Sequence, residues 1–176
     1  MTFKQKTFEL IEQNEIVFND LIKYVDLIEK TNKILNLTGF TGDSLWREGI
    51  YQSIILMKES FKNTENKKML DIGAGAGFPS VPFLIYKRNF SLFISEPNNK
   101  RVVFLQQVDK ELSLDISFIK VRIEDYQENN TFDMITARAV TSLKNLIEIS
   151  SKVGSINAEY SFLKGPKIYK ELEDSE

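Results

Sequence analysis

The sequence predicts an α/β fold in which a mostly parallel sheet is flanked by helices and preceded by an N-terminal helical cap. Three observations predict this class. In residues 68–163, short apolar runs alternate with helix-length segments, which is typical of parallel strands joined by right-handed crossovers. A glycine-rich turn follows the first of these runs, as in open sheets that bind nucleotide-like ligands. Before residue 62, apolar residues recur about every 3.6 positions, which indicates helices with one buried face.

Length and composition limit the remaining choices. The chain has 176 residues, of which 42% are hydrophobic and 27% charged. This suits one globular unit, which we divide into a helical cap (residues 1–62) and a ligand-binding core (residues 63–176). No apolar run approaches about eighteen residues, and residues 1–20 are polar. We therefore expect neither a membrane span nor a secretory signal but a cytoplasmic protein.

Two residue types are absent from the sequence. With no cysteine, the chain has no disulfide, no thiolate metal site and no cysteine nucleophile. With no histidine, it lacks the commonest general base and the commonest metal ligand, so no metal is expected. The net charge of −2 disfavours a protein that grips nucleic acid by its phosphates, so binding to RNA would need a local basic patch.

Helices are expected across residues 3–61, the cap. The polar clusters at residues 36–39 and 42–44 interrupt the helical pattern, and Asp43 or Ser44 is expected to be the N-cap of a last helix over residues 45–61. The simplest interpretation is that these helices cover one edge of the sheet. The alternative is that they also form a wall of the substrate cleft.

Strands and helices then alternate through the core. Pro79 and Pro82 lie in the opening turn of the first core helix, where proline is tolerated. The expected strands are residues 68–72, 91–96, 116–121, 132–137 and 159–163, and the expected helices are residues 79–86, 98–112 and 143–153. Few residues follow the fifth strand, so we expect the C-terminal strands that would normally finish such a sheet to be missing.

Glycines alternate with other residues in the turn after the first strand. Gly73, Gly75 and Gly77 follow Asp71 in an Asp-x-Gly-x-Gly-x-Gly pattern, which differs from the Gly-x-Gly-x-x-Gly of dinucleotide binders. This spacing favours S-adenosylmethionine (SAM) over NAD. A carboxylate at position 71 supports this choice, because it can face the ammonium group of a methionine moiety but would repel a pyrophosphate. The alternative is a plain turn between strand and helix that binds nothing.

Acidic and apolar residues at the ends of the next two strands suit an adenosine. Glu96 closes the second strand and can accept hydrogen bonds from both ribose hydroxyls; alternatively, it is a carboxylate favoured by the helix that follows. Glu124 follows the third strand, where a polar or backbone group can meet the adenine edge, while Ile123 and Phe78 can sandwich the ring. Taken alone, Glu124 is only part of a solvated turn.

Arg138 lies at the carboxyl end of the fourth strand, where ligands of such sheets bind. A structural salt bridge to Glu124 or Asp71 is the alternative. Residues 136–139 read Thr-Ala-Arg-Ala, unlike the Asp/Asn-Pro-Pro-aromatic run that holds an exocyclic amine. A ring nitrogen such as guanine N7 already has a free lone pair, so methylating it needs orientation and desolvation but no base.

Cationic side chains near this edge are candidates for contacts with RNA, although each is equally suited to be a solvated surface charge. They would orient phosphates or the guanine O6. The candidates are Lys100, Arg101, Arg138 and Lys164.

Over roughly residues 24–165, these patterns together resemble the RsmG/GidB family of 16S rRNA guanine-N7 methyltransferases. The most specific block is residues 70–82, with its paired prolines. Further matching segments are Glu96 with residues 100–105, residues 122–125, 136–139 and 163–165, and, in the cap, residues 32–33 and 36–38. The chain departs from the family at Glu48-Gly49 and Gln52-Ser53, where the family usually has Arg-His and Asp-Ser.

The resemblance implies a SAM-dependent methyltransferase (Rossmann-like) fold whose SAM-binding core is residues 63–176. It implies transfer of a methyl group from SAM to N7 of a guanosine in 16S rRNA, with 16S rRNA or the small ribosomal subunit as partner, and a monomer. The residues implied to contact SAM are Gly73, Phe78, Ile123, Glu124 and Arg138, the last also orienting the substrate. A small-molecule SAM-dependent methyltransferase and a SAM-binding module without turnover remain alternatives, and an NAD oxidoreductase is a more distant one.

Overall fold

The computed structural model describes residues 1–138 and 140–164. Within these ranges, five strands form one sheet in the order β3-β2-β1-β4-β5, and every neighbouring pair is parallel. The strands are β1 (Lys68–Ile72), β2 (Ser91–Ser95), β3 (Ser117–Ile119), β4 (Phe132–Arg138) and β5 (Gly154–Leu163). The predicted α/β class with a parallel sheet is confirmed. The expectation that strands are missing after residue 163 falls on residues 165–176, outside the described ranges.

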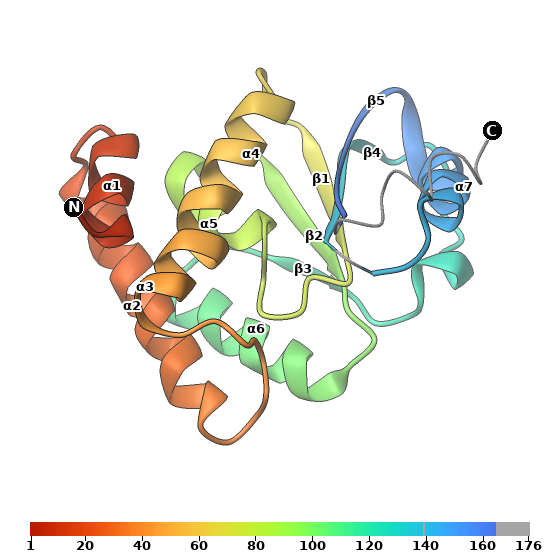
Figure 1. Cartoon of the computed structure of the whole chain (residues 1–176). Helices are drawn as coiled ribbons and strands as arrows, with labels where there is room; N and C mark the ends of the chain where they lie inside the picture. The colour runs from red at the N-terminus through yellow and green to blue at the C-terminus, as the bar shows by residue number, and fades with distance from the viewer. Residues whose placement is uncertain (139, 165–176) are drawn as a thin grey trace.

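Helices cover the two faces of the sheet unequally (Figure 1). The cap together with α5 (Ser80–Lys87) and α6 (Asn99–Leu112) lies on one face, and α7 (Leu143–Val153) lies on the other. Strand side chains alternate between the faces, so Met69 belongs to the large core beneath the cap and Leu70 to a smaller core beneath α7. A short 3-10 turn, η2 (Ile123–Asp125), follows β3.

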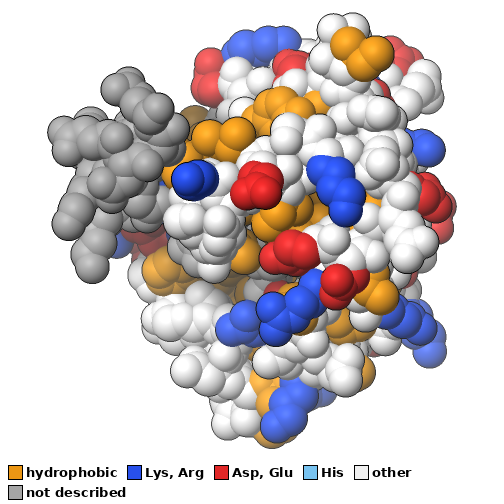
Figure 2. All heavy atoms as spheres, turned by 90° about the vertical axis from the view of Figure 1, so that its right-hand side faces the viewer, with side chains coloured by type: hydrophobic (Ala, Val, Ile, Leu, Met, Phe, Trp, Pro, Cys, Tyr) orange, Lys and Arg blue, Asp and Glu red, His pale blue; other side chains and the backbone are white. Residues whose placement is uncertain are grey.

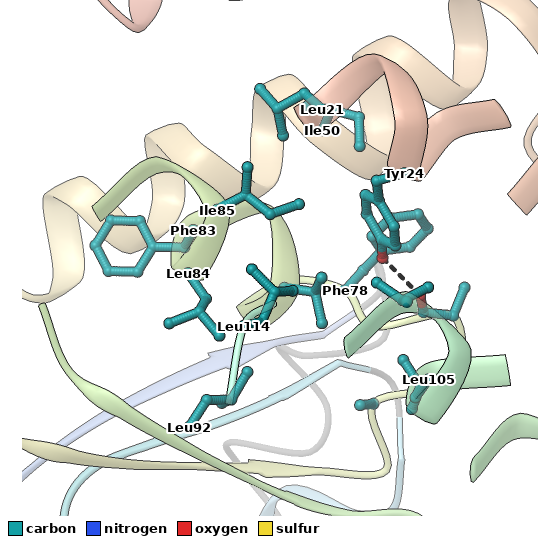
Figure 3. Close-up of a cluster of buried hydrophobic side chains, with 14 of the residues drawn as sticks. Leu21, Tyr24, Ile50, Phe78, Phe83, Leu84, Ile85, Leu92, Leu105 and Leu114 are labelled. Atoms are coloured by element: carbon teal, nitrogen blue, oxygen red, sulfur yellow. Dashed lines mark hydrogen bonds between the residues drawn. The ribbon is translucent and has the colours of Figure 1, made fainter. Parts of the chain in front are cut away.

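The cap is built from helical segments that pack outside α5 and α6. They are α1 (Phe3–Leu10), α2 (Glu15–Asn32), α3 (Gly42–Ser44), the π-helical segment η1 (Leu45–Tyr51) and α4 (Gln52–Ser60). Figure 3 shows Leu21, Tyr24 and Ile50 of the cap lying above Phe83 and Ile85 of α5, all of them fully buried. No helix within residues 1–138 and 140–164 combines the length and apolar character that crossing a bilayer needs.

Two details of the cap differ from the sequence expectation. The helical period does not reveal the break between α1 and α2, where Glu12 and Gln13 adopt positive φ and the side chain of Asn14 caps α2. The expected N-cap at Asp43 or Ser44 is wrong. Thr41 is the N-cap of α3, and its backbone N–H donates to Ser44 Oγ (3.0 Å). Both misplacements occur in polar stretches, where several side chains can cap a helix.

The core elements agree closely with the predicted ranges except at β3 and β5. The observed β3 is three residues long rather than six. The observed β5 begins at Gly154, directly after α7, rather than at residue 159. Its pairing with β4 is irregular between Phe132 and Met134. Polar and apolar residues alternate from residue 155 to residue 162, so the strand pattern extends before the predicted start.

Candidate functional site

The candidate site is built on the turn between β1 and α5, at the carboxyl end of the sheet (Figure 1). The N–H of Gly73 donates to the Ser95 carbonyl (2.7 Å), which ties the turn to the end of β2. Gly73, Gly75 and Gly77 have φ values of +67°, +60° and +102°. L side chains rarely adopt these conformations, so the backbone itself requires glycine at all three positions.

The three glycines face different surroundings. A Cβ at Gly75 would have no neighbour within 4 Å, so this position is open. A Cβ at Gly73 would lie 2.8 Å from Val140 Cγ2, and one at Gly77 would lie 2.7 Å from the Tyr24 hydroxyl. Gly77 thus faces the core, not the open side of the turn, and its glycine is required for packing rather than for the ligand approach that the sequence suggested.

Glu96 joins the glycine turn to the start of α6. Its side chain is buried; Oε2 accepts the N–H of Gly75 (2.9 Å) and Oε1 accepts the N–H of Asn98 (2.9 Å). Arg101 Nη1 lies 3.9 Å from Oε2. Each carboxylate oxygen has two lone pairs, so the bonds from Gly75 and Asn98 leave capacity to accept hydroxyl protons. Both interpretations of Glu96, helix-start carboxylate and potential ribose ligand, are compatible with this geometry.

Two adjoining hollows open on this turn. The first, which we call the arginine hollow, has a volume of about 390 Å³ and is lined by the glycine turn, Phe40, Phe78, Glu96 and Arg138 among others. The second, the isoleucine hollow, has a volume of about 250 Å³. Its lining includes Pro97, Arg122, Ile123, Glu124 and Val140. Together they reach the size typical of small-molecule sites.

Val140 separates the two hollows. It lines both of them, as do Gly73 and Pro97. Phe78 lines only the arginine hollow and Ile123 only the isoleucine hollow. The two residues expected to sandwich the adenine thus line adjoining hollows, and the sandwich stays a prediction. A further hollow of about 340 Å³ continues from Ile123 along α7, away from the glycine turn.

Arg138 connects β4 to the cap. Its Nη1 donates to the Glu48 backbone carbonyl (2.9 Å), and its guanidinium carbon lies 5.3 Å from the Phe40 ring centre and 6.0 Å from that of Phe78. Its hydrogen-bond partner is thus a carbonyl, not the carboxylate of Glu124 or Asp71. Burial lowers the pKa of the Arg138 guanidinium, while the nearby charge of Glu48 raises it. Arginine keeps its charge even so, so the hollow has a fixed cation beside two aromatic rings.

Asp71 lies beneath the turn rather than in either hollow. It is fully buried, and Ser80 Oγ donates to its Oδ2. Its Oδ1 has no hydrogen-bond partner within the described part of the chain. Burial raises the pKa of the Asp71 carboxyl to about 7; the bonds from Ser80 oppose this shift and the charge of Glu96 adds to it. The structure places Asp71 outside the lining of both hollows, and its expected contact with an ammonium group stays a prediction.

The other cationic candidates lie at different distances from the hollows. Arg101 lines the arginine hollow. Lys100 is exposed on the first turn of α6. Lys164 donates to the Thr141 carbonyl, and Thr141 lines the isoleucine hollow. Lysines, arginines and acidic side chains alternate over the face beside α7 (Figure 2), so this face shows no patch of a single charge sign among its described residues.

Sequence reasoning missed Phe40 and Val140, and it noted Gly49 only as a departure from the family. Phe40 is the single aromatic residue of the loop between α2 and α3, which is the one signal that marked it. A Cβ at Gly49 would lie 2.7 Å from the Phe78 ring, so this glycine lets the cap close onto the turn. No group of three or more acidic, histidine or cysteine residues within the described ranges is arranged to hold a metal ion.

The donor set fits SAM. The open position at Gly75 would be filled by a Cβ, and Glu96 retains hydrogen-bonding capacity at the same turn. An adenosine with a cationic methionine needs such an acceptor for its ribose, close backbone approach and nearby negative charge.

Comparison with known structures and sequences identifies the fold and the family. A geranyl diphosphate C-methyltransferase from Streptomyces coelicolor, solved with S-adenosyl-L-homocysteine, superimposes with a TM-score of 0.54 at 18% identity, over 63% of this chain and 43% of that one. The fold is that of the Rossmann-like, SAM-dependent methyltransferases. The family described as GidB, rRNA small subunit methyltransferase G, matches residues 17–176, and the chain belongs to this family.

Two relatives carry the same description. A ribosomal RNA small subunit methyltransferase G from Mesomycoplasma hyopneumoniae strain J is 45% identical over 89% of this chain and 80% of its own length. One from Mycoplasmopsis pulmonis is 42% identical over 99% of this chain and 73% of its own length. The resemblance found in the sequence motifs is thus confirmed.

Proposed function

We propose that this chain transfers the methyl group of SAM to N7 of a guanosine in 16S rRNA. Its membership of the rRNA small subunit methyltransferase G family makes it a SAM-dependent methyltransferase. The observation that carries the assignment to this site is the hydrogen bond from the Gly75 N–H to Glu96 Oε2. This bond holds Glu96, the proposed acceptor for the ribose hydroxyls, beside the open glycine turn at the rim of the arginine hollow.

The cofactor would be held from both hollows. Glu96 would accept the ribose hydroxyls, and the backbone at Gly73 and Gly75 would allow close approach of the methionine moiety. Ile123 and Glu124 would face the adenine in the isoleucine hollow, since both line it together with Pro97. Phe78 would bound the methionine side as part of the arginine hollow. When bound, SAM supplies an electrophilic methyl group on a sulfonium.

The chain's own residues need only orient and desolvate the acceptor. The guanine N7 lone pair forms the new N–C bond as the methyl–sulfur bond breaks, and no proton has to be removed. Arg138 would orient the base or a neighbouring phosphate, since its cation lines the same hollow as the glycine turn. This role suits a chain with no histidine and no cysteine.

The remaining contacts would be made with the RNA backbone. Arg101, Lys100 and Lys164 would bind phosphates along the edge of the hollows, which compensates locally for the net charge of −2. The chain would act as a monomer in the cytoplasm, and its partner would be 16S rRNA or the small ribosomal subunit.

Methyl transfer and cofactor binding test this proposal separately. Radiolabelled SAM should label 16S rRNA in small subunits from cells that lack this protein, and mass mapping should place the methyl on guanine N7. Glu96→Gln should weaken SAM binding in calorimetry by about tenfold or more, because an amide replaces a charged acceptor.

The matched control is Glu159→Gln, which alters a glutamate of β5 paired with Lys67 (2.7 Å) and so lies outside both hollows. It should bind SAM as the unmodified chain does. Label in a metabolite extract but not in rRNA would favour a small-molecule substrate, and SAM binding without any label would favour a module without turnover.

A further inference from the structure

The loop between α2 and α3 is held in one conformation beside the arginine hollow. The Asn32 side chain donates from Nδ2 to the Thr38 carbonyl (2.7 Å) and accepts, through Oδ1, the N–H groups of Leu37 (2.8 Å) and Thr38 (3.1 Å). Leu37 is buried. One side chain thus satisfies three backbone polar groups of the loop. These bonds order the loop at the rim of the arginine hollow without a ligand.

This loop places Phe40 at the hollow. The Phe40 N–H donates to Thr38 Oγ1 (3.2 Å), and the half-buried ring lies against the Arg138 guanidinium (5.3 Å). Phe78, the other aromatic residue that lines the hollow, is only 5% exposed. Its ring packs edge-on to Tyr24 (6.1 Å between ring centres) and against Gly49. Phe40 is therefore the more exposed of the two aromatic residues.

The chemistry of the acceptor favours recognition through its face. Arginine and lysine usually read guanine by donating to O6 and N7. A donor on N7 would occupy the lone pair that must attack the methyl group, so this edge has to stay free. The flat face of the base carries no such conflict, and unpaired RNA bases commonly stack on aromatic side chains.

We propose that Phe40 is the stacking platform for the target guanine. This inference rests on the function proposed above and extends it to the residue that holds the base. The Arg138 guanidinium lies 5.3 Å from the centre of the same ring. One of its N–H groups donates to the Glu48 carbonyl, and the others would meet O6 or a phosphate while N7 stays unpaired. Phe40 is in this way a determinant of substrate binding and not of cofactor binding.

Substitutions at Phe40 distinguish stacking on the guanine from a role in which the ring only positions the Arg138 side chain. With Phe40→Ala, the kcat/KM of methyl transfer to small subunits should fall by about 5- to 100-fold, the effect typical of losing one base–aromatic stack. The affinity for SAM should stay within about twofold. Phe40→Trp should retain most of the activity, because it keeps an aromatic face, whereas Phe40→Leu keeps apolar bulk and should remain impaired.

Phe3→Ala is the matched control. Phe3 is also half-buried in the cap and also lies against cations, Lys6 (4.4 Å) and Arg47 (5.9 Å), but it does not line the arginine hollow. Its loss should leave kcat/KM within about twofold. Thermal unfolding of each variant confirms that it folds, and Phe40→Leu tests the stacking role if Phe40→Ala does not fold.

The outcomes are distinct. If Phe40→Ala weakens SAM binding as much as methyl transfer, Phe40 only positions Arg138 and the stacking role is wrong. If the unmodified chain labels rRNA and Phe40→Leu or Phe40→Ala labels it equally well, the stacking role is wrong while the proposed function stands. If the unmodified chain labels no rRNA, the proposed function fails and the stacking role fails with it.

Discussion

The two sides of the glycine turn differ in what they face. On one side, Gly75 opens onto the arginine hollow, and a Cβ at this position would have nothing within 4 Å. On the other side, a Cβ at Gly77 would meet Tyr24, Val81 and Leu105. All three glycines of the pattern have positive φ, yet one faces open space in the hollow and another admits the packing of the cap. A single sequence pattern can thus record two separate physical requirements.

The largest effect on stability is expected at Gly77, on the packed side of the turn. Gly77→Ala should lower the free energy of unfolding by about 2–5 kcal/mol, because it combines a positive φ with an overpacked Cβ. The Tyr24 hydroxyl, Val81 and Leu105 all lie within 3.1 Å of that Cβ. Urea unfolding measures this loss. A loss below about 1 kcal/mol would mean that the two sides do not differ as described.

The second largest effect on stability is expected from the buried Asp71 carboxyl beneath the turn. Folding raises the pKa of Asp71 from 3.8 to about 7, so between these pH values the folded chain holds a proton that the unfolded chain has lost. The free energy of unfolding should therefore fall as pH rises from about 4 to about 7, by up to about 4 kcal/mol from this group.

Urea unfolding of the unmodified chain and of Asp71→Asn across this pH range measures the contribution of Asp71. Asparagine does not titrate, so the difference between the two curves should change steadily from acid to neutral pH, with Asp71→Asn becoming relatively more stable. Two parallel curves would contradict the raised pKa.

A smaller effect is expected from the bond that joins the cap to the turn. The Tyr24 hydroxyl donates to the Ala76 carbonyl (2.6 Å; Figure 3), and Tyr24→Phe should cost about 1–2 kcal/mol of unfolding free energy because it leaves that carbonyl unpaired. In the Gly77→Ala background the cost should shrink, since the hydroxyl is the atom nearest the new Cβ. Additive costs in a double-mutant cycle would refute this coupling.

An effect on stability as small as that of Tyr24→Phe is expected on the open side. Gly75→Ala should cost about 1–2 kcal/mol from its positive φ alone, without a steric contribution. Its effect on ligand binding should be of similar size: the affinity for SAM should fall by about tenfold, because the added alanine methyl group occupies the hollow. Calorimetry on the folded variant checks this, and unchanged affinity would place the ligand elsewhere.

Much of the core could be predicted from the sequence because its signals are periodic and local. Apolar runs, helix-length spacers and Pro79 with Pro82 in an opening turn were sufficient to predict the sheet and its helices. Residues 154–158 were not predicted as strand, although polar and apolar residues alternate there, because β5 follows α7 without an intervening turn and pairs with β4 in an irregular register.

The candidate site was predictable only in part. Gly75 and Glu96 are 21 positions apart and meet as expected at the ends of neighbouring strands. The direction in which Gly77 faces depends on where Tyr24 packs, and the position of Phe40 depends on the hydrogen bonds of Asn32. Such contacts between distant segments leave no periodic signal in a single sequence. The roles of these residues toward SAM and RNA stay predictions.

The hydrogen bond from Arg138 to the Glu48 carbonyl has a consequence for the boundary between cap and core. A backbone group of the cap holds the cation of β4, while Gly49 and Tyr24 press on the turn itself. Cleavage between residues 62 and 63 would therefore leave the C-terminal piece with an unanchored guanidinium and an incomplete cleft wall. Complementation in trans by the N-terminal piece would be needed to rebuild the wall.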